Sequence, residues 1–299
     1  MLGALAAFTA SVTWAFASTR YAQAAQDAGS VRVNLVRALS ASLLWLVALA
    51  LLDSPAALLA IDLERALLLA GSIACSYAIG DSVFYAAATR AGVSVALAVA
   101  TIYPLWAALY GALARAEPFG PLRVLGVFSC VGGVAALLAQ TRAGSSLERA
   151  AGVAGVGLAL LTSLFWAGNA VFLKLGAEGL SLYQTNALRF SLGALLLWLQ
   201  LPFKRRREAA PSGQPSASLV RLLRRLWLPL LADTGLGSVA FVYGITHTDL
   251  ALGATLSSLS PLVALPMAVA LGSERVTPGK ALAVTITVAG VVLLVTAPR

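Results

Sequence analysis

Apolar residues dominate the chain in ten long runs that are separated by mostly short polar connections. A bilayer core about 30 Å thick is crossed by about 20 helical residues, each rising 1.5 Å. Each run is long enough for one crossing, so the pattern predicts an all-α polytopic membrane protein with ten transmembrane helices. The runs cover residues 2–22, 32–52, 66–89, 92–114, 121–140, 152–174, 181–203, 226–247, 250–271 and 278–297.

Composition narrows the class of protein further. Of the 299 residues, 60% are hydrophobic and 11% are charged, and the mean hydropathy is +0.88. Soluble domains carry about 25% charged residues, so a cytosolic enzyme, a disordered chain and a secreted disulfide scaffold are excluded. The formal charge of +9 comes from Lys and Arg residues between apolar runs, where they control membrane orientation. Nucleic-acid binding, which needs a basic stripe on a folded face, is therefore not expected.

The first run could be mistaken for a signal peptide, because Ala22-Gln23-Ala24 resembles a cleavage site, but no basic residue precedes the run, as a signal peptide would need. We therefore expect it to be an integral span. The lack of a targeting extension and the compact form of the chain favour a multi-pass protein of a bacterial inner membrane.

The two halves of the chain match each other. Each half, residues 1–142 and 143–299, carries five runs, and the extra residues of the second half fall in or near the basic loop 204–225. An odd number of spans forces the second half into the opposite orientation. Inverted repeats recur in secondary transporters, whose substrate sites lie near the bilayer midplane between the halves. The matched residues include Trp14, Asn34 and Arg37 with Trp166, Asn186 and Arg189, and Gly80, Pro104 and Glu117 with Gly237, Pro261 and Glu274.

Several short motifs resemble those of a known family. They are Val12–Phe16 and Leu164–Asn169 around the matched Trp residues, Tyr103-Pro104-Leu105 and Ser260-Pro261-Leu262. In their order and spacing these motifs resemble the drug/metabolite transporter superfamily, in its EamA-type branch, over nearly the whole chain. The resemblance implies a secondary carrier, often an exporter, of amino acids, nucleosides, sugars or other small molecules. The first half departs from the pattern, because it lacks the Asn and Lys that follow Trp166.

Asp81 lies past the middle of the third run. Tyr77, Asp81 and Tyr85 follow i, i+4 and i+8 spacing, which would place them on one helix face. Ionisable groups inside spans cost about 2.5–3.5 kcal/mol each on insertion scales and are functional candidates. Because an acid flanked by aromatic rings suits an amphipathic or cationic ligand, we expect these residues to line a substrate cavity. The alternative is a packing face whose acid bonds a neighbouring helix.

Asp233 is a second acid within a run, roughly two turns into the eighth. The repeat aligns Asp233 with Ser76 and Asp81 with Ser238, so the two acids are not symmetry mates. An acid that is dehydrated in a membrane cavity has its neutral form favoured. Proton coupling through Asp81 or Asp233 is therefore a hypothesis.

Pro104 and Pro261 occupy matched positions in the fourth and ninth runs. Proline lacks an amide hydrogen, so each is predicted to kink its helix and free a carbonyl one turn back. Broken helices at matched positions point to transporter sites, although the kinks could instead only shape the bundle. The polar residues beside them that we expect in the cavity are Tyr103, Ser257, Ser258 and Ser260.

Trp14, Trp166 and Asn169 lie near the middle of their runs. Tryptophan usually marks a membrane interface, so these mid-span residues are predicted either to face the cavity or to pack between helices. All three are candidate substrate-binding residues.

Charged residues nearer the run ends have simpler interpretations. Arg37, Arg189 and Lys174 are expected to extend toward the lipid headgroups. Glu117 and Glu274 lie in short loops just before a proline, and we expect them to mark helix starts.

Small residues are frequent in the fifth and tenth runs, including Gly126, Gly133 and Gly290. They allow close helix contact, so we expect these runs to serve packing within the chain or a homodimer interface.

The orientation of the chain stays open. Most Lys and Arg residues lie on the side opposite the termini, above all in the loop 204–225, so the positive-inside rule places both termini outside. The family resemblance implies that both termini lie inside.

A secondary carrier that moves a small amino acid-like, amine or drug-like solute by alternating access is the leading functional hypothesis. The expected partners are this small-molecule substrate and the lipid bilayer. No catalytic set, Gly-rich phosphate loop or metal-ligand cluster is visible, so we expect no enzyme, metal or cofactor. The alternatives are a passive channel and a membrane protein without transport activity.

Overall fold

Helices make up nearly all of the chain that the computed structural model describes, namely residues 1–91, 96, 99–117, 119–139, 148–205, 219–260, 262–263 and 277–297. No strand occurs among these residues. Pro261, Glu274 and most of the loop 204–225 lie outside them. The first half contains α1 (Leu2–Ala28), α2 (Ser30–Leu52), η1 (Pro55–Ala60), α3 (Leu63–Ile73), η2 (Ala74–Ala78), α4 (Gly80–Ala91), α6 (Tyr103–Ala114) and α7 (Pro121–Ala139). The second half contains α8 (Glu148–Gly176), α9 (Leu182–Arg205), α10 (Leu219–Leu230), η3 (Leu231–Gly237), α11 (Ser238–Thr246), α12 (Leu250–Ser257) and α14 (Pro278–Thr296).

Four continuous helical stretches of the described chain are long and apolar enough to cross a membrane. Large apolar side chains such as Leu43, Leu113 and Trp198 are exposed on the outside of the bundle, where a bilayer would cover them. The all-helical class with apolar spans is thus confirmed, while the count of ten stays a prediction. The four stretches are Ser30–Leu52, Leu63–Ala91, Val153–Gly176 and Val220–Thr246, and three shorter apolar helices cover Leu2–Ser18, Pro121–Ala136 and Ala281–Leu294.

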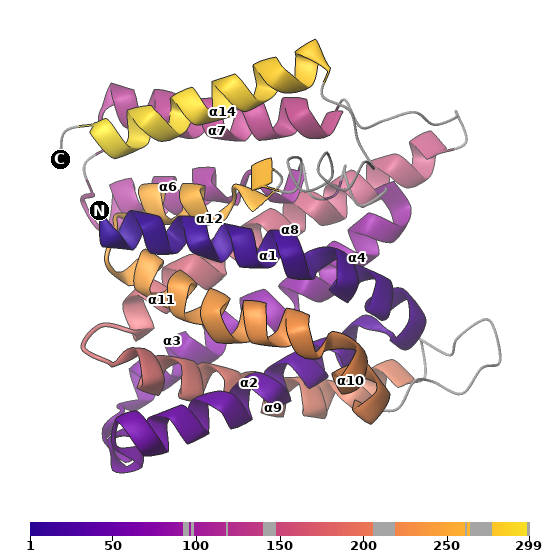
Figure 1. Cartoon of the computed structure of the whole chain (residues 1–299), viewed down its shortest axis with the longest axis vertical. Helices are drawn as coiled ribbons and strands as arrows, with labels where there is room; N and C mark the ends of the chain where they lie inside the picture. The colour runs from indigo at the N-terminus through magenta and orange to yellow at the C-terminus, as the bar shows by residue number, and fades with distance from the viewer. Residues whose placement is uncertain are drawn as a thin grey trace.

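Helices from the two halves of the chain lie side by side throughout the bundle. At one edge α2 packs along α9, and at the other edge α7 packs along α14 (Figure 1). Between these edges α1 packs against α11, α4 against α8 and α6 against α12. The start of α1 and the end of α14 lie at the same end of the bundle, which we call the terminal end (Figure 1).

Two spans contain a widened, π-helical turn. In the first half η2 continues α3 into α4, and in the second half η3 continues α10 into α11. Each holds a residue that the sequence analysis singled out, Tyr77 in η2 and Asp233 in η3. Such turns interrupt the regular helix and are frequent at functional sites.

The fourth and ninth runs are each interrupted near their prolines. Residues 101 and 102 form a turn, and Pro104 stands in the first turn of α6. The predicted kink at Pro104 is therefore wrong, because Pro104 lies at the start of a helix. In the first turn a backbone amide has no partner within the helix, so the missing amide of proline costs no hydrogen bond. In the ninth run α12 ends at Ser257, shortly before Pro261.

Candidate functional site

A cavity lies between helices from both halves of the chain. Its volume is about 130 Å³, measured as the space open to the centre of a water molecule. Its lining combines aromatic, hydroxyl and charged side chains, as ligand sites usually do. The residues contributed by the first half are Ala10, Trp14, Arg37, Ser76, Tyr77, Asp81, Thr101 and Tyr103. Those contributed by the second half are Trp166, Asn169, Arg189, Phe190, Asp233, Gly237, Ser238, Phe241, Ser257, Ser258 and Ser260.

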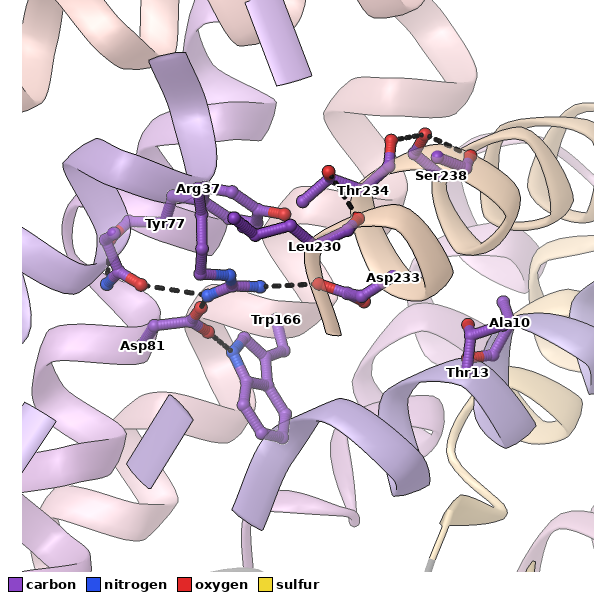
Figure 2. Close-up of polar contacts among 12 residues, drawn as sticks. Ala10, Thr13, Arg37, Tyr77, Asp81, Trp166, Leu230, Asp233, Thr234 and Ser238 are labelled. Carbon is purple, nitrogen blue, oxygen red and sulfur yellow. Dashed lines mark hydrogen bonds and ion pairs between the residues drawn. The ribbon is translucent and has the colours of Figure 1, made fainter. Parts of the chain in front are cut away.

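Arg37 joins the two acids of the cavity, Asp81, which is buried, and Asp233, which is partly buried. Its Nη1 lies 2.5 Å from Asp81 Oδ2, and its Nη2 lies 3.1 Å from Asp233 Oδ2 (Figure 2). Nη1 also donates to Asn34 Oδ1 at 2.8 Å. The guanidinium carbon lies 4.0 Å from the centre of the Tyr77 ring, which adds a cation–π contact.

The expectation that Arg37 reaches the headgroups is therefore wrong. Its side chain is 1% exposed, because two acids within the membrane interior attract the cation more strongly than the interface does. A paired and hydrogen-bonded charge is the form in which ions are tolerated inside spans.

Trp166 connects this ionic cluster to an aromatic wall. Its Nε1 donates to Asp81 Oδ1 at 3.2 Å (Figure 2). The Trp166 ring meets those of Trp14 and Tyr103 edge to face, with ring centres 6.3 and 6.2 Å apart. Such arrangements are favoured by the ring quadrupoles, so these rings form an ordered apolar surface beside the charges.

Arg189 also lines the cavity, and no acid of the described part of the chain pairs with it. Its Nε donates to Ser72 Oγ at 3.2 Å, and its Nη2 donates to Asn169 Oδ1 at 2.9 Å. Ser72 Oγ donates in turn to Asn169 Oδ1 at 2.8 Å. The side chain of Arg189 is buried, so the expectation that it reaches the headgroups is also wrong.

Most residues predicted from the sequence to bind substrate do meet at the cavity. Tyr85 is the exception, since it is absent from the lining and its buried ring packs 5.7 Å from that of Phe84. Tyr85 lies one turn beyond Asp81 in α4, where the helix packs against the core instead of the cavity. The predicted residues that line the cavity are Trp14, Tyr77, Asp81, Tyr103, Trp166, Asn169, Asp233, Ser257, Ser258 and Ser260.

Several lining residues were missed, above all Arg37 and Arg189. Their signal was present in the sequence, because an Asn precedes each Arg by three residues at matched positions of the two halves. Two acids inside spans also require a cation nearby. No comparable signal marks Ser76, Ser238 or Phe241, because serine and phenylalanine are common residues in apolar helices.

Ion pairs between the halves surround the terminal end of the bundle. Glu117 pairs with Lys174 at 3.1 Å, and its Oε2 accepts from the backbone amide of Leu250 at 2.7 Å. Lys174 also donates to the carbonyl of Thr248. Glu117 thus marks a helix start as expected, but the helix is α12. Lys174 is tied to these partners, so its expected extension toward the headgroups is wrong.

Asp53 makes a further contact between the halves at the terminal end, outside the spans. It follows α2 and accepts hydrogen bonds from the hydroxyl of Ser181 and the amide of Ser54. These bonds favour the ionised form and hold the pKa of Asp53 below its usual value.

Comparison with known proteins connects this arrangement to a family. The model of the EamA-like transporter family matches residues 1–139 and 153–296. A curated protein of Archaeoglobus fulgidus, named an uncharacterized transporter, is 37% identical over 109 residues, which is 36% of this chain and 38% of that protein. The match therefore spans well under half of either protein.

A crystal structure of another protein shares the fold. It superposes with a TM-score of 0.74 over 97% of this chain and 95% of the other, at 18% sequence identity. Because the family model covers nearly the full length and the helices are apolar, the chain is an integral multi-pass membrane protein that belongs to the EamA-like transporter family.

Proposed function

We propose that this protein is a secondary transporter that exports a small organic metabolite by alternating access and catalyses no reaction. The observation that supports this most is the cavity between the halves, where aromatic rings stand beside two arginines and two aspartates. Apolar walls with a few oriented polar groups are the usual form of a small-molecule site. Amino acid-like, amine and drug-like solutes all fit this chemistry, and a bacterial inner membrane is the location that we propose.

We further propose that ten spans form two inverted five-helix halves. The matched π-helical turns support this, because η2 and η3 begin 157 residues apart, at the offset that also aligns Gly80 with Gly237. The reciprocal pairing of helices supports it too, since α1 meets α11 as α8 meets α4. In such transporters one half moves against the other around a midplane site.

Efflux from proteoliposomes tests the transport activity. Purified protein is reconstituted in vesicles loaded with amino acids, nucleosides, amines and sugars, and mass spectrometry follows their loss with and without a pH gradient. We expect selective and saturable loss of one solute class relative to protein-free vesicles. Loss that is unselective and does not saturate would indicate a channel. No loss of any solute from folded protein would contradict the proposal.

The ionic cluster suggests what drives transport. Arg37 carries one positive charge and its partners Asp81 and Asp233 carry two negative charges when both are ionised, so the cluster has one acid in excess. An uncompensated charge inside a membrane is costly, and one proton on the pair would remove it. We propose that this shared proton couples transport to the pH gradient.

Neutral variants of the two acids test the coupling. Asp233→Asn and Asp81→Asn each leave Arg37 with one carboxylate, and we expect either to make solute flux insensitive to an imposed pH gradient. Asp27→Asn, which alters an exposed pair with Arg225, is the matched control. If both cavity variants fold and keep the wild-type response to the gradient, proton coupling through these acids is wrong.

A further inference from the structure

The two arginines of the cavity occupy matched positions of the repeat but have different partners. Arg37 and Arg189 stand 152 residues apart, and each follows an Asn by three residues. Both side chains line the cavity and are almost fully buried, with 1% and 3% of each residue exposed. The surroundings of Arg37 are acidic, whereas those of Arg189 are neutral.

Arg189 lacks acids at the positions that would match those of the two acids around Arg37. The repeat aligns Asp81 with Ser238 and Asp233 with Ser76, and both serines line the same cavity. Within the described chain no carboxylate therefore pairs with Arg189.

Arg189 also has unused capacity to donate hydrogen bonds. Nε and Nη2 are bound to Ser72 and Asn169, both neutral, and Nη1 makes no hydrogen bond to any residue that the structure describes. Ser257 Oγ, also at the cavity, is buried and likewise lacks a partner in that part of the chain. The cavity thus holds one guanidinium nitrogen and one hydroxyl that form no hydrogen bond with a described residue.

A buried cation without an acid is expensive in a membrane. Resting on the proposed transport function, we propose that Arg189 binds the carboxylate of the transported solute, which supplies the negative charge that Arg189 lacks. The planar guanidinium suits a carboxylate, with which it forms short, charge-assisted bonds. The neighbouring rings of Trp166 and Phe190 would contact the apolar part of the solute.

The other charges of the cavity favour a carboxylate over a phosphate. The four charged lining residues are Arg37, Arg189, Asp81 and Asp233, and their charges sum to +1 when the two aspartates share the proton proposed above. A phosphate ester would bring about two negative charges into a cavity that already holds two aspartates. A carboxylate brings one, which Arg189 alone can balance.

Matched solutes that differ only in the acidic group test this assignment. Proteoliposomes are loaded with phenylalanine, phenylalaninamide, phenethylamine and phenylpyruvate, with parallel leucine derivatives, and with phosphoserine as the phosphate ester. We expect wild-type protein to move solutes with a carboxylate and to exclude the amides and amines. The same probes are added to detergent-solubilised protein, where a bound carboxylate should raise the Tm.

Variants of Arg189 identify the binding residue. Arg189→Gln should lower carboxylate flux at least about tenfold and abolish the carboxylate-induced rise in Tm, because one charge-assisted bond pair is lost. Arg189→Lys keeps the charge without the planar fork, so we expect a higher KM at a similar maximal rate. Arg225→Gln removes a cation from an exposed pair and should change neither measurement.

The outcomes separate this inference from the proposed function. If wild-type protein moves amides, amines or phosphoserine as well as carboxylates, the carrier stands and the carboxylate assignment is wrong. If Arg189→Gln does not fold, the KM of Arg189→Lys decides, and an unchanged value overturns the role of Arg189. If no probe moves and no carboxylate raises the Tm, both proposals fail.

Discussion

Arg37 pairs with two acids at once, so at the scale of single residues its removal should be the most damaging change in the cavity. Arg37→Gln leaves Asp81 and Asp233 buried without a cation, and breaking a buried ion pair in this way costs about 3–5 kcal/mol. We expect a clear fall in the Tm of the purified protein in detergent. Thermal unfolding measured beside wild type checks this expectation.

Two further variants make that result specific. Arg225→Gln breaks an exposed pair with Asp27 and should alter stability by less than about 1 kcal/mol. Adding Asp81→Asn and Asp233→Asn to Arg37→Gln should recover part of the lost stability, since neither position then holds a carboxylate without its cation. An Arg37→Gln protein as stable as wild type would show that the carboxylates do not depend on this cation.

The sequence predicted the acids of the cavity better than the cations. Asp81 and Asp233 stood out because a carboxylate cannot easily reach the headgroups from the middle of a span. Arg37 has a long side chain, for which extension to the interface is the common outcome. Its true partner Asp233 lies 196 residues away in the chain, and only the packing of α2 beside η3 brings the two together.

At the scale of elements, Glu117 links the first half to the start of α12. Glu117→Ala removes the acceptor of the Leu250 amide and the partner of Lys174. Both groups are partly buried, so we expect a loss of about 1–3 kcal/mol and faster hydrogen exchange at the Leu250 amide. Mass spectrometry of exchange and thermal unfolding measure these effects.

Glu178 provides the matched control for Glu117. It pairs with Arg115 at the same end of the bundle, but its side chain is 54% exposed. Exposed pairs contribute little to stability, so Glu178→Ala should leave both measurements close to wild type. Equal effects of the two variants would contradict a specific role of Glu117 at α12.

Glycines set the distance between α7 and α14. A Cβ added at Gly290 would lie 2.7 Å from the backbone nitrogen of Cys130 and 2.8 Å from the carbonyl oxygen of Gly126. Because backbone atoms cannot move aside easily, Gly290→Ala should separate the helices and cost about 1–3 kcal/mol. The fall in Tm is the measurement.

Gly132 tests the same substitution where space is open. It lies on α7, and a Cβ there would meet nothing within 4 Å. Gly132→Ala should therefore keep or slightly raise the Tm, since alanine favours the helical state. If Gly132→Ala and Gly290→Ala destabilise alike, close packing at Gly290 is not the cause.

Hydrophobic runs predicted where the helices lie, but not their internal irregularities. The π-helical turns η2 and η3 carry no sequence pattern that marks a widened turn, and their widening depends on how neighbouring helices pack. The interruption at Pro104 was foreseen, but not that proline would begin a new helix. A proline in an apolar run indicates that the helix is interrupted there. Whether the helix kinks or a new helix begins depends on the residues on either side.

At the scale of the whole molecule, the bundle has both ends of the chain on one side. The start of α1 and the end of α14 meet at the terminal end (Figure 1), as an even number of crossings requires. We therefore predict that reporters fused before Met1 and after Arg299 give the same compartment. A fluorescent protein and alkaline phosphatase, fused separately to each end, measure this, because each is active on one side of the membrane only.

The same fusions decide the orientation. The end opposite the termini carries a basic helix, α10, with Arg221, Arg224 and Arg225, and cations are retained on the cytoplasmic side during insertion. If that bias dominates, the reporters at both ends place the termini outside the cytoplasm. Replacing these three arginines with glutamine should then weaken the preference for this orientation. If the reporters at both ends place the termini in the cytoplasm, the orientation that the family resemblance implies is correct and the positive charge of α10 does not decide it. Fusions that report opposite sides would contradict an even number of crossings and, with it, the two five-span halves.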